Sequence, residues 1–229
     1  ACKDILERGG TPILVGGSGF YIHTLLYGPP QGPPSQPEIR QAIEREMARL
    51  GSEHLFRHLQ HLDPEYAATI TGNDRQKIVR ALEIITLTGK PVSQLTWGER
   101  RSPTDFSFSC WFLYRPKDVL YSRIEDRCEE MIDAGLLEEV ARLDRMGLRE
   151  NRSACQAIGY RQCLDYLDSA HTHEDYVRFL EDFKRGSRRY AKRQFTWFRK
   201  EPLFRWIDIE QHDPELAIDM MVRDFESRL

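Results

Sequence analysis

Along most of this chain, hydrophobic residues recur every three or four positions, the spacing that places them on one face of an α-helix. Glycines, prolines and N-cap residues interrupt the pattern and divide it into separate helices. The predicted helices cover residues 20–26, 35–51, 53–61, a short stretch from 63, 73–89, 116–134, 136–146, 157–167, 174–198 and 214–228. Between them lie three short runs of strand composition, at residues 12–15, 106–114 and 204–208.

Capping residues mark several of these helix ends. Ser35 and Glu38 have the spacing of a capping box, and Asp63 followed by Pro64 is typical of an N-cap and the first helical position. Glycines end the predicted helices, at Gly51, Gly89, Gly135 and Gly147.

The first predicted strand belongs to a strand–turn–helix unit of the α/β kind. Residues 12–15 are a short apolar run between glycine pairs, which is typical of a buried parallel strand, and the glycine turn 16–19 follows directly. A connector with four prolines, residues 28–34, marks a domain edge, and no strand is predicted from 35 to about 100. The predicted organisation is a split α/β core, residues 1–35 and 106–229, with an all-helical insertion domain, residues 36–105.

Three strands are few for so many helices. The first strand begins soon after Ala1, and the residues before it resemble the end of a helix. We therefore expect the N-terminal strands of a parallel sheet to be missing from these 229 residues.

Composition narrows the function classes. The formal net charge is −3, so binding of a nucleic acid requires a local basic patch. The five cysteines are scattered without a Cys-x-x-Cys pair, which argues against a disulfide framework and a zinc site. No apolar run is long enough to span a membrane and no signal peptide is recognisable, so a cytoplasmic location is expected. His54, His58 and His61 lie close in sequence without a completing cysteine or carboxylate, and no metal site is predicted.

The segment from Lys184 to Lys200 is the strongest sign of function. It contains eight Lys or Arg residues and no Asp or Glu. On a helix, its cations form two adjacent ridges, Lys184, Arg188 and Lys192 beside Arg185, Arg189 and Arg193. An apolar side for docking on a core is predicted at Tyr176, Leu180, Phe183, Tyr190 and Trp197. The basic side is suited to a phosphate backbone, although a solvated basic face would have the same pattern.

Other candidates are weaker when taken alone. The glycine turn 16–19 could bind a phosphate through backbone N–H groups, or could be a simple tight turn, since no Gly-Lys-Ser/Thr follows it. Arg123 and Arg127 lie one helical turn apart, so they could grip one phosphate group or pair with neighbouring acids. Tyr160 and Arg161 follow a glycine where a sugar–phosphate chain could be contacted, but helix packing is a fair alternative.

Taken together, five segments in order resemble the tRNA dimethylallyltransferase family, also called tRNA isopentenyltransferases. They are Pro12–Tyr21, Asn73–Glu83 with Thr88–Lys90, Arg123–Arg127 with Met131 and Gly135, Ala157–Arg161, and Lys192–Arg199. The resemblance covers nearly the whole chain, and the last segment, Lys-Arg-Gln-Phe-Thr-Trp-Phe-Arg, is very specific. The bacterial type is favoured because the C-terminal zinc finger of eukaryotic members has no counterpart.

The resemblance implies an enzyme with a P-loop-kinase-like core, whose helical insertion grips the anticodon stem-loop of a tRNA. It transfers a dimethylallyl group from dimethylallyl diphosphate to N6 of the adenosine next to the anticodon, after that base has been flipped out. An acidic residue takes the N6 proton, while cations, the P-loop and Mg²⁺ hold the leaving diphosphate. The family's P-loop and general-base Asp lie upstream of the strand near Pro12, so this chain contains no catalytic residue and is predicted to be inactive alone.

Site residues follow from the resemblance by position. Arg127, with Arg123 as second choice, matches the arginine that faces the diphosphate. The residues implied in tRNA contact are Ser18, Arg40, Gln76, Lys77, Ile78, Val79, Arg80, Gln156, Ala157, Ile158, Gly159, Tyr160, Arg161, Lys192, Arg193, Gln194, Phe195, Thr196, Trp197, Phe198 and Arg199. The enzyme is expected to act as a monomer. Two alternatives stay open: a non-catalytic helical RNA-binding module, and an adenylate prenyltransferase that modifies free nucleotides.

Overall fold

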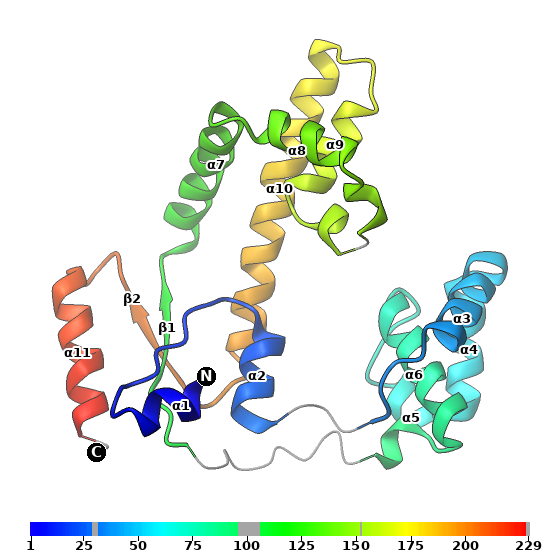
Figure 1. Ribbon diagram of the computed structural model, residues 1–229, viewed down its shortest axis with the longest axis horizontal. Helices are drawn as coiled ribbons and strands as arrows, with labels where there is room; N and C mark the ends of the chain where they lie inside the picture. The colour runs from blue at the N-terminus through cyan, green and yellow to red at the C-terminus, as the bar shows by residue number, and fades with distance from the viewer. Residues whose placement is uncertain (29–31, 96–105, 152, 228–229) are drawn as a thin grey trace. The chain divides into compact units, whose positions relative to one another are not determined.

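The structure, a computed structural model, describes residues 1–28, 32–95, 106–151 and 153–227. The chain forms two compact units, one made of Ala1–Gly19 with Ser107–Leu229 and one made of Phe20–Phe106 (Figure 1). The sequence had predicted a boundary after residue 35, whereas Phe20 and the residues that follow it cluster with the helical unit. Within the described residues, no helix is long and apolar enough to cross a membrane.

The first unit combines a small parallel sheet with long helices. Its elements are α1 (Cys2–Glu7), β1 (Cys110–Tyr114), α7 (Lys117–Asp133), α8 (Leu136–Arg145), η2 (Leu148–Glu150), η3 (Ala154–Gln156), α9 (Tyr160–Leu167), α10 (His173–Phe198), β2 (Phe204–Asp208) and α11 (Pro214–Glu226). Gly135 and Gly147 have positive φ after α7 and α8, as the predicted helix ends require. The described part is thus a helix-rich α/β protein.

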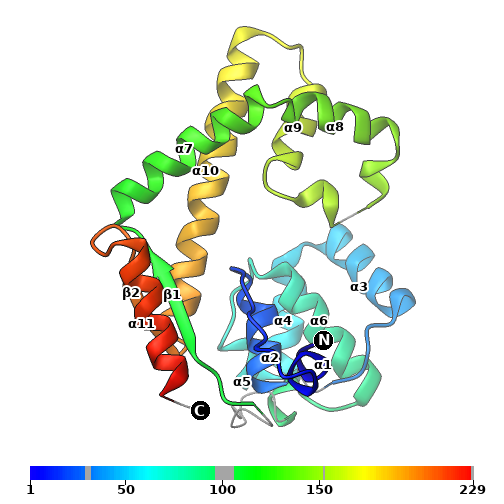
Figure 2. The same cartoon turned by 60° about the vertical axis from the view of Figure 1, so that its left-hand side comes forward.

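The sheet is built from the two strands that the sequence predicts on either side of α10. β1 and β2 pair in parallel, with Cys110 opposite Phe204 and Tyr114 opposite Asp208. α11 lies beside these strands (Figure 2), and the Asp224 carboxylate accepts a hydrogen bond of 2.6 Å from the Ser109 hydroxyl.

The predicted strand at residues 12–15 is wrong. These residues adopt no strand in the described structure, and Ile13 and Val15 are 84% and 88% exposed. A strand requires a neighbouring strand for its backbone hydrogen bonds, and β1 and β2 pair only with each other in the described sheet. The apolar run is therefore exposed in the described structure, although its composition is that of a buried strand.

Helix α10 lies against α7 and α9 in a core whose centre includes Phe179, Phe183 and Val140. Its buried residues are Phe179, Phe183, Ala191 and Phe198. The predicted apolar side was misplaced at Tyr190, which is 41% exposed with the Arg193 guanidinium 5.5 Å from its ring centre. One residue turns a helix by about 100°, so the choice between positions 190 and 191 moves the buried stripe to another face.

The second unit is entirely helical in its described residues. It contains most of α2 (Gly19–Tyr27), then α3 (Pro37–Leu50), α4 (Ser52–Leu62), α5 (Pro64–Ala67), α6 (Arg75–Thr88) and η1 (Val92–Gln94). Its core includes Leu59 and Ile78, both 0% exposed. The predicted N-cap Asp63 is confirmed, since its carboxylate accepts the backbone N–H of Tyr66 at 3.0 Å.

The predicted capping box at Ser35 is wrong. α3 begins at Pro37 after Gln36, without a side-chain cap. The Ser35 hydroxyl donates instead to the Glu83 carboxylate of α6, at 2.6 Å. A partner 48 residues away competes with the local cap, and spacing within a helix carries no information about it.

Candidate nucleic-acid interface

The glycine turn docks on the C-terminal half of α10. The Gly17 carbonyl accepts a hydrogen bond from Gln194 Nε2 at 3.1 Å. A Cβ added at Gly19 would lie 2.2 Å from Cδ2 of Trp197, so the turn backbone approaches the indole more closely than any side chain permits. Close packing explains these glycines without a bound phosphate. The contact places Ser18 beside Gln194 and Trp197, three of the residues that the resemblance implies in tRNA contact.

In the sequence, exposed cations without ion pairs lie before and after Gln194 and Trp197, the two residues of α10 that contact the glycine turn. Arg189, Lys192 and Arg193 are exposed, as is Arg199, which follows the last residue of the helix. In the described part of the chain, none of the four forms an ion pair with an acidic side chain. This half of α10 therefore keeps its positive charge for an anionic ligand.

The N-terminal half of the basic segment is neutralised by acidic side chains. Arg188 Nη1 lies 2.5 Å from Glu125 Oε1 on α7, and Lys184 forms an ion pair with Glu129 one helical turn further along α7. The hydrogen bond that Lys184 donates to the Glu129 carboxylate raises the pKa of Lys184. Arg185 pairs with Asp182 of its own helix. The sequence predicted two continuous ridges of unpaired cations. In the described residues, only the C-terminal members of these ridges, Arg189, Lys192 and Arg193, form no ion pair.

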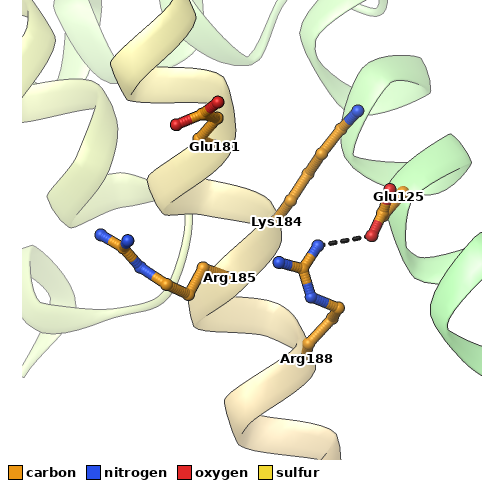
Figure 3. Close-up of a pocket in the computed structure, with 5 residues that line it drawn as sticks. All are labelled: Glu125, Glu181, Lys184, Arg185 and Arg188. Atoms are coloured by element: carbon orange, nitrogen blue, oxygen red, sulfur yellow. Dashed lines mark hydrogen bonds and ion pairs between the residues drawn. The ribbon is translucent and has the colours of Figure 1, made fainter.

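A cavity of about 340 Å³ lies at this neutralised end. It is lined by Glu125, Glu181, Lys184, Arg185 and Arg188 (Figure 3). Arg188 and Glu125 point toward each other across it, from α10 and α7. Because each cation of the lining is paired with a carboxylate, the cavity has no uncompensated charge for a phosphate.

The loop before α9 is fixed against the middle of α10. Gly159 is buried with φ +94°, and its N–H donates to the Gln162 side chain at 2.9 Å. Gln162 approaches α10 at Gly186, where an added Cβ would lie 3.1 Å from its amide nitrogen. The loop meets α10 about 14 Å along the helix axis from the glycine turn, at 1.5 Å per residue.

Within that loop, the predicted contact residues differ in accessibility. Gln156, Ala157 and Arg161 are exposed, Ile158 is half-buried, and the Tyr160 hydroxyl donates to Glu139 of α8. This hydrogen bond raises the pKa of Tyr160. The exposed amide of this stretch, Gln156, ends η3, and its exposed arginine, Arg161, lies in the first turn of α9.

Arg123 and Arg127 are exposed on α7. In the described structure neither forms an ion pair, and the nearby carboxylates Glu125 and Glu129 pair with Arg188 and Lys184 of α10. The two arginines are therefore available to one ligand, as the proposed diphosphate role requires.

In the helical unit, only some of the predicted tRNA-contact residues are exposed at the surface. Gln76 and Lys77 are exposed at the start of α6. Ile78 and Val79 are 0% and 3% exposed in the core, so contact of their side chains with a tRNA is excluded. The prediction took a continuous segment, whereas successive residues of a helix are rotated by about 100°, so only some of them face any one surface.

Arg40 and Arg80 are both held by the buried carboxylate of Glu83. Arg80 Nη1 lies 2.7 Å from Glu83 Oε2, and Arg40 Nη1 lies 3.8 Å from the same oxygen. Arg80 also donates to the Pro33 carbonyl at 2.5 Å. Sequence reasoning assigned no role to Glu83, although it ends the matching segment Asn73–Glu83 and is an acidic residue in the apolar pattern of α6.

Two aromatic residues of the last predicted segment, the buried Phe198 and the half-buried Phe195, pack against other rings. Phe198 is 1% exposed and packs on Phe112, with ring centres 4.8 Å apart. The Phe195 ring lies 5.4 Å from that of Phe112. These rings position the helix, and the accessible members of the segment are Lys192, Arg193, Thr196 and Arg199.

No group of three or more His, Cys, Asp or Glu side chains in the described residues is arranged to hold a metal ion. The Mg²⁺ implied by the resemblance therefore has no set of protein ligands in this part of the chain, and we assign no step to it.

These features define a helix-rich α/β protein with a candidate surface for a phosphate-bearing ligand on α10. Comparison with known proteins gives its family. The sequence model described as IPP transferase matches residues 1–201, so the chain belongs to the IPP transferase family. The expectation drawn from the five sequence segments is confirmed.

Curated relatives and solved structures agree with this family. The chain is 58% identical over 226 residues to the tRNA dimethylallyltransferase of Protochlamydia amoebophila (strain UWE25), covering 99% of this chain and 66% of that protein. It is similar to the full-length tRNA isopentenylpyrophosphate transferase of Bacillus halodurans, with a TM-score of 0.61, 33% identity and coverage of 98% and 68% of the two chains. A eukaryotic dimethylallyltransferase acting on tRNA gives a TM-score of 0.71 at 25% identity, covering 99% and 59%. The chain thus spans 66% of the length of its Protochlamydia relative.

Proposed function

We propose that this protein modifies tRNA by transferring a dimethylallyl group from dimethylallyl diphosphate to N6 of the adenosine next to the anticodon. The observation that carries the proposal is the docking of the glycine turn on α10 between unpaired, exposed cations. Membership of the IPP transferase family and the names of its relatives support the same activity.

In this proposal, the chain's own residues bind and orient the substrates. Arg189, Lys192, Arg193 and Arg199 contact the phosphate backbone of the anticodon stem-loop, and Ser18 lies where the turn meets the RNA. In the helical unit, Gln76, Lys77 and the exposed edges of Arg40 and Arg80 contact the same tRNA. Arg127 holds the diphosphate, with Arg123 one turn away. A flipped adenosine exposes the N6 amino group that the transfer requires.

The proposed architecture is a P-loop-kinase-like core with a helical insertion, acting as a monomer. Four phosphate contacts, three from α10 and one from Arg199 directly after it, predict a log–log salt slope of roughly −3 to −4 for tRNA binding. A non-catalytic RNA-binding module would give the same slope without transfer. An adenylate prenyltransferase would modify AMP, which has no stem for α10 to contact.

The activity can be tested in a chimera with the Protochlamydia relative, in which residues 1–229 replace the matching segment. We expect dimethylallyl transfer to unmodified tRNA and none to AMP, measured with labelled dimethylallyl diphosphate. Arg127→Gln in the chimera should lower transfer by at least about tenfold, because it removes a charged contact to the leaving group. Arg145→Gln, a change of an exposed arginine on α8, is the matched control.

Binding without transfer by a folded chimera would favour the non-catalytic module. Equal transfer to AMP and tRNA would favour the adenylate prenyltransferase. The prediction that the 229 residues alone do not catalyse the reaction is tested in the same assay.

A further inference from the structure

We propose that Glu125 and Glu129 are specificity-determining residues that limit where RNA binds along α10. This inference rests on the proposed function. By occupying Arg188 and Lys184, the two carboxylates restrict phosphate contacts to the C-terminal half of the helix, beside the glycine turn.

Two ion pairs join α7 and α10 at successive helical turns. Glu125 and Glu129 lie one turn apart on α7, and their partners Arg188 and Lys184 lie one turn apart on α10 in the opposite order. Between them, Cys128 Sγ lies 3.6 Å from the Ser187 hydroxyl in a packed contact of the two helices. The side chains of Lys184 and Arg188 are only 17% and 30% exposed. Helix packing therefore holds both ion pairs in place.

A phosphate can use Lys184 or Arg188 only by replacing a carboxylate. The displaced Glu125 or Glu129 would then remain close to the phosphate, where like charges repel. In the C-terminal half of α10 a phosphate does not have to replace a carboxylate, because Arg189, Lys192 and Arg193 form no ion pair in the described chain. The boundary between paired and unpaired cations thus sets the end of the RNA footprint.

The boundary between paired and unpaired cations would affect which RNA molecules bind to α10. If all six cations from Lys184 to Arg193 of α10 were unpaired, the helix would bind any RNA duplex, whereas a short cationic patch beside the glycine turn favours RNA that also fits the turn. The carboxylates lower non-specific affinity and favour one position of the stem on α10.

The test is the salt dependence of binding to an unmodified tRNA transcript by the chain itself. The variant Glu125→Gln/Glu129→Gln releases two cations, so its log–log slope should become steeper by roughly one to two units. The matched control is Asp126→Asn/Glu130→Gln, which removes the same charge from exposed positions of α7 that form no ion pair in the described residues. Its slope should equal that of the wild type.

Equal slopes for the two double variants would overturn the inference. Single changes on α10 provide a second readout if the double variant does not fold. Lys184→Gln should leave the slope unchanged, while Lys192→Gln should flatten it by roughly 0.7 to 0.9; flattening by Lys184→Gln would contradict the proposed boundary. Failure of the wild-type chain to bind tRNA would instead refute the proposed function, so the two failures are distinguishable.

Discussion

Glu83 is a fully buried carboxylate that joins three parts of the helical unit. It accepts hydrogen bonds from the Ser35 hydroxyl, the Gln36 backbone N–H at 2.8 Å and the Arg80 guanidinium. Burial acts to raise its pKa, but the hydrogen bonds from Ser35, Arg80 and Gln36 outweigh burial and hold the pKa below the ordinary 4.5. The charged form is therefore the one that stabilises the fold.

Glu83→Gln should destabilise the helical unit by about 3 kcal/mol at pH 7, because it leaves buried donors facing an amide. A carboxyl with a lowered pKa contributes its full stability above pH 4.5 and loses it as pH falls through the folded-state pKa. The difference between wild type and variant should therefore shrink below pH 4.5 in denaturant titrations.

Glu44→Gln is the control for this substitution, since it removes a partly exposed partner of Arg40. It should cost less than about 1 kcal/mol. A loss as large as that of Glu83→Gln, or a Glu83→Gln difference that grows with falling pH, would contradict the role assigned to the buried carboxylate.

The contact between the glycine turn and α10 requires the backbone at Gly17 and Gly19 to lie directly against side chains of α10. At Gly19 an added Cβ meets the Trp197 ring, which cannot bend away, whereas at Gly17 it meets the end of the flexible Gln194 side chain. Gly19→Ala should therefore cost about 1–3 kcal/mol and weaken tRNA binding, and Gly17→Ala should cost less. Thermal unfolding and Trp fluorescence measure the two effects; equal costs at both glycines would refute the docking geometry.

The existence of α10 was predictable, but its environment was not. The spacing of apolar residues predicted a long helix, and the observed span His173–Phe198 agrees with the predicted 174–198. The choice between Tyr190 and Ala191 as a buried position depends on the surfaces of α7 and α9. Neutralisation by Glu125 and Glu129 depends on a helix more than 50 residues away in sequence, and no spacing rule reveals that pairing.

For the strands too, the sequence predicted some features and could not predict others. β1 and β2 were found from composition, since each has a partner within the described chain. Residues 12–15 have equally strong strand composition, yet composition cannot supply the neighbour that a strand requires. Family resemblance supplied the predicted contact segments, while the burial of Ile78, Val79 and Phe198 became visible only in three dimensions.

Each of the two units has its own hydrophobic core. One core includes Leu59 of α4, at 0% exposure, and the other includes Leu164 of α9, at 6%. Because the buried residues of each core belong to one unit, loss of packing in one core should reduce protection mainly within that unit.

Leu59→Ala and Leu164→Ala make the same chemical change in the two cores, and each should cost about 2–5 kcal/mol. Hydrogen exchange of the full chain, followed segment by segment, measures where protection is lost. We expect Leu59→Ala to expose amides of α3, α4 and α6, and Leu164→Ala to expose those of α8, α9 and α10. The two units would then be separately stable, and each could lose its packing without unfolding the other. Equal loss of protection across both units after either substitution would show a single cooperative structure instead.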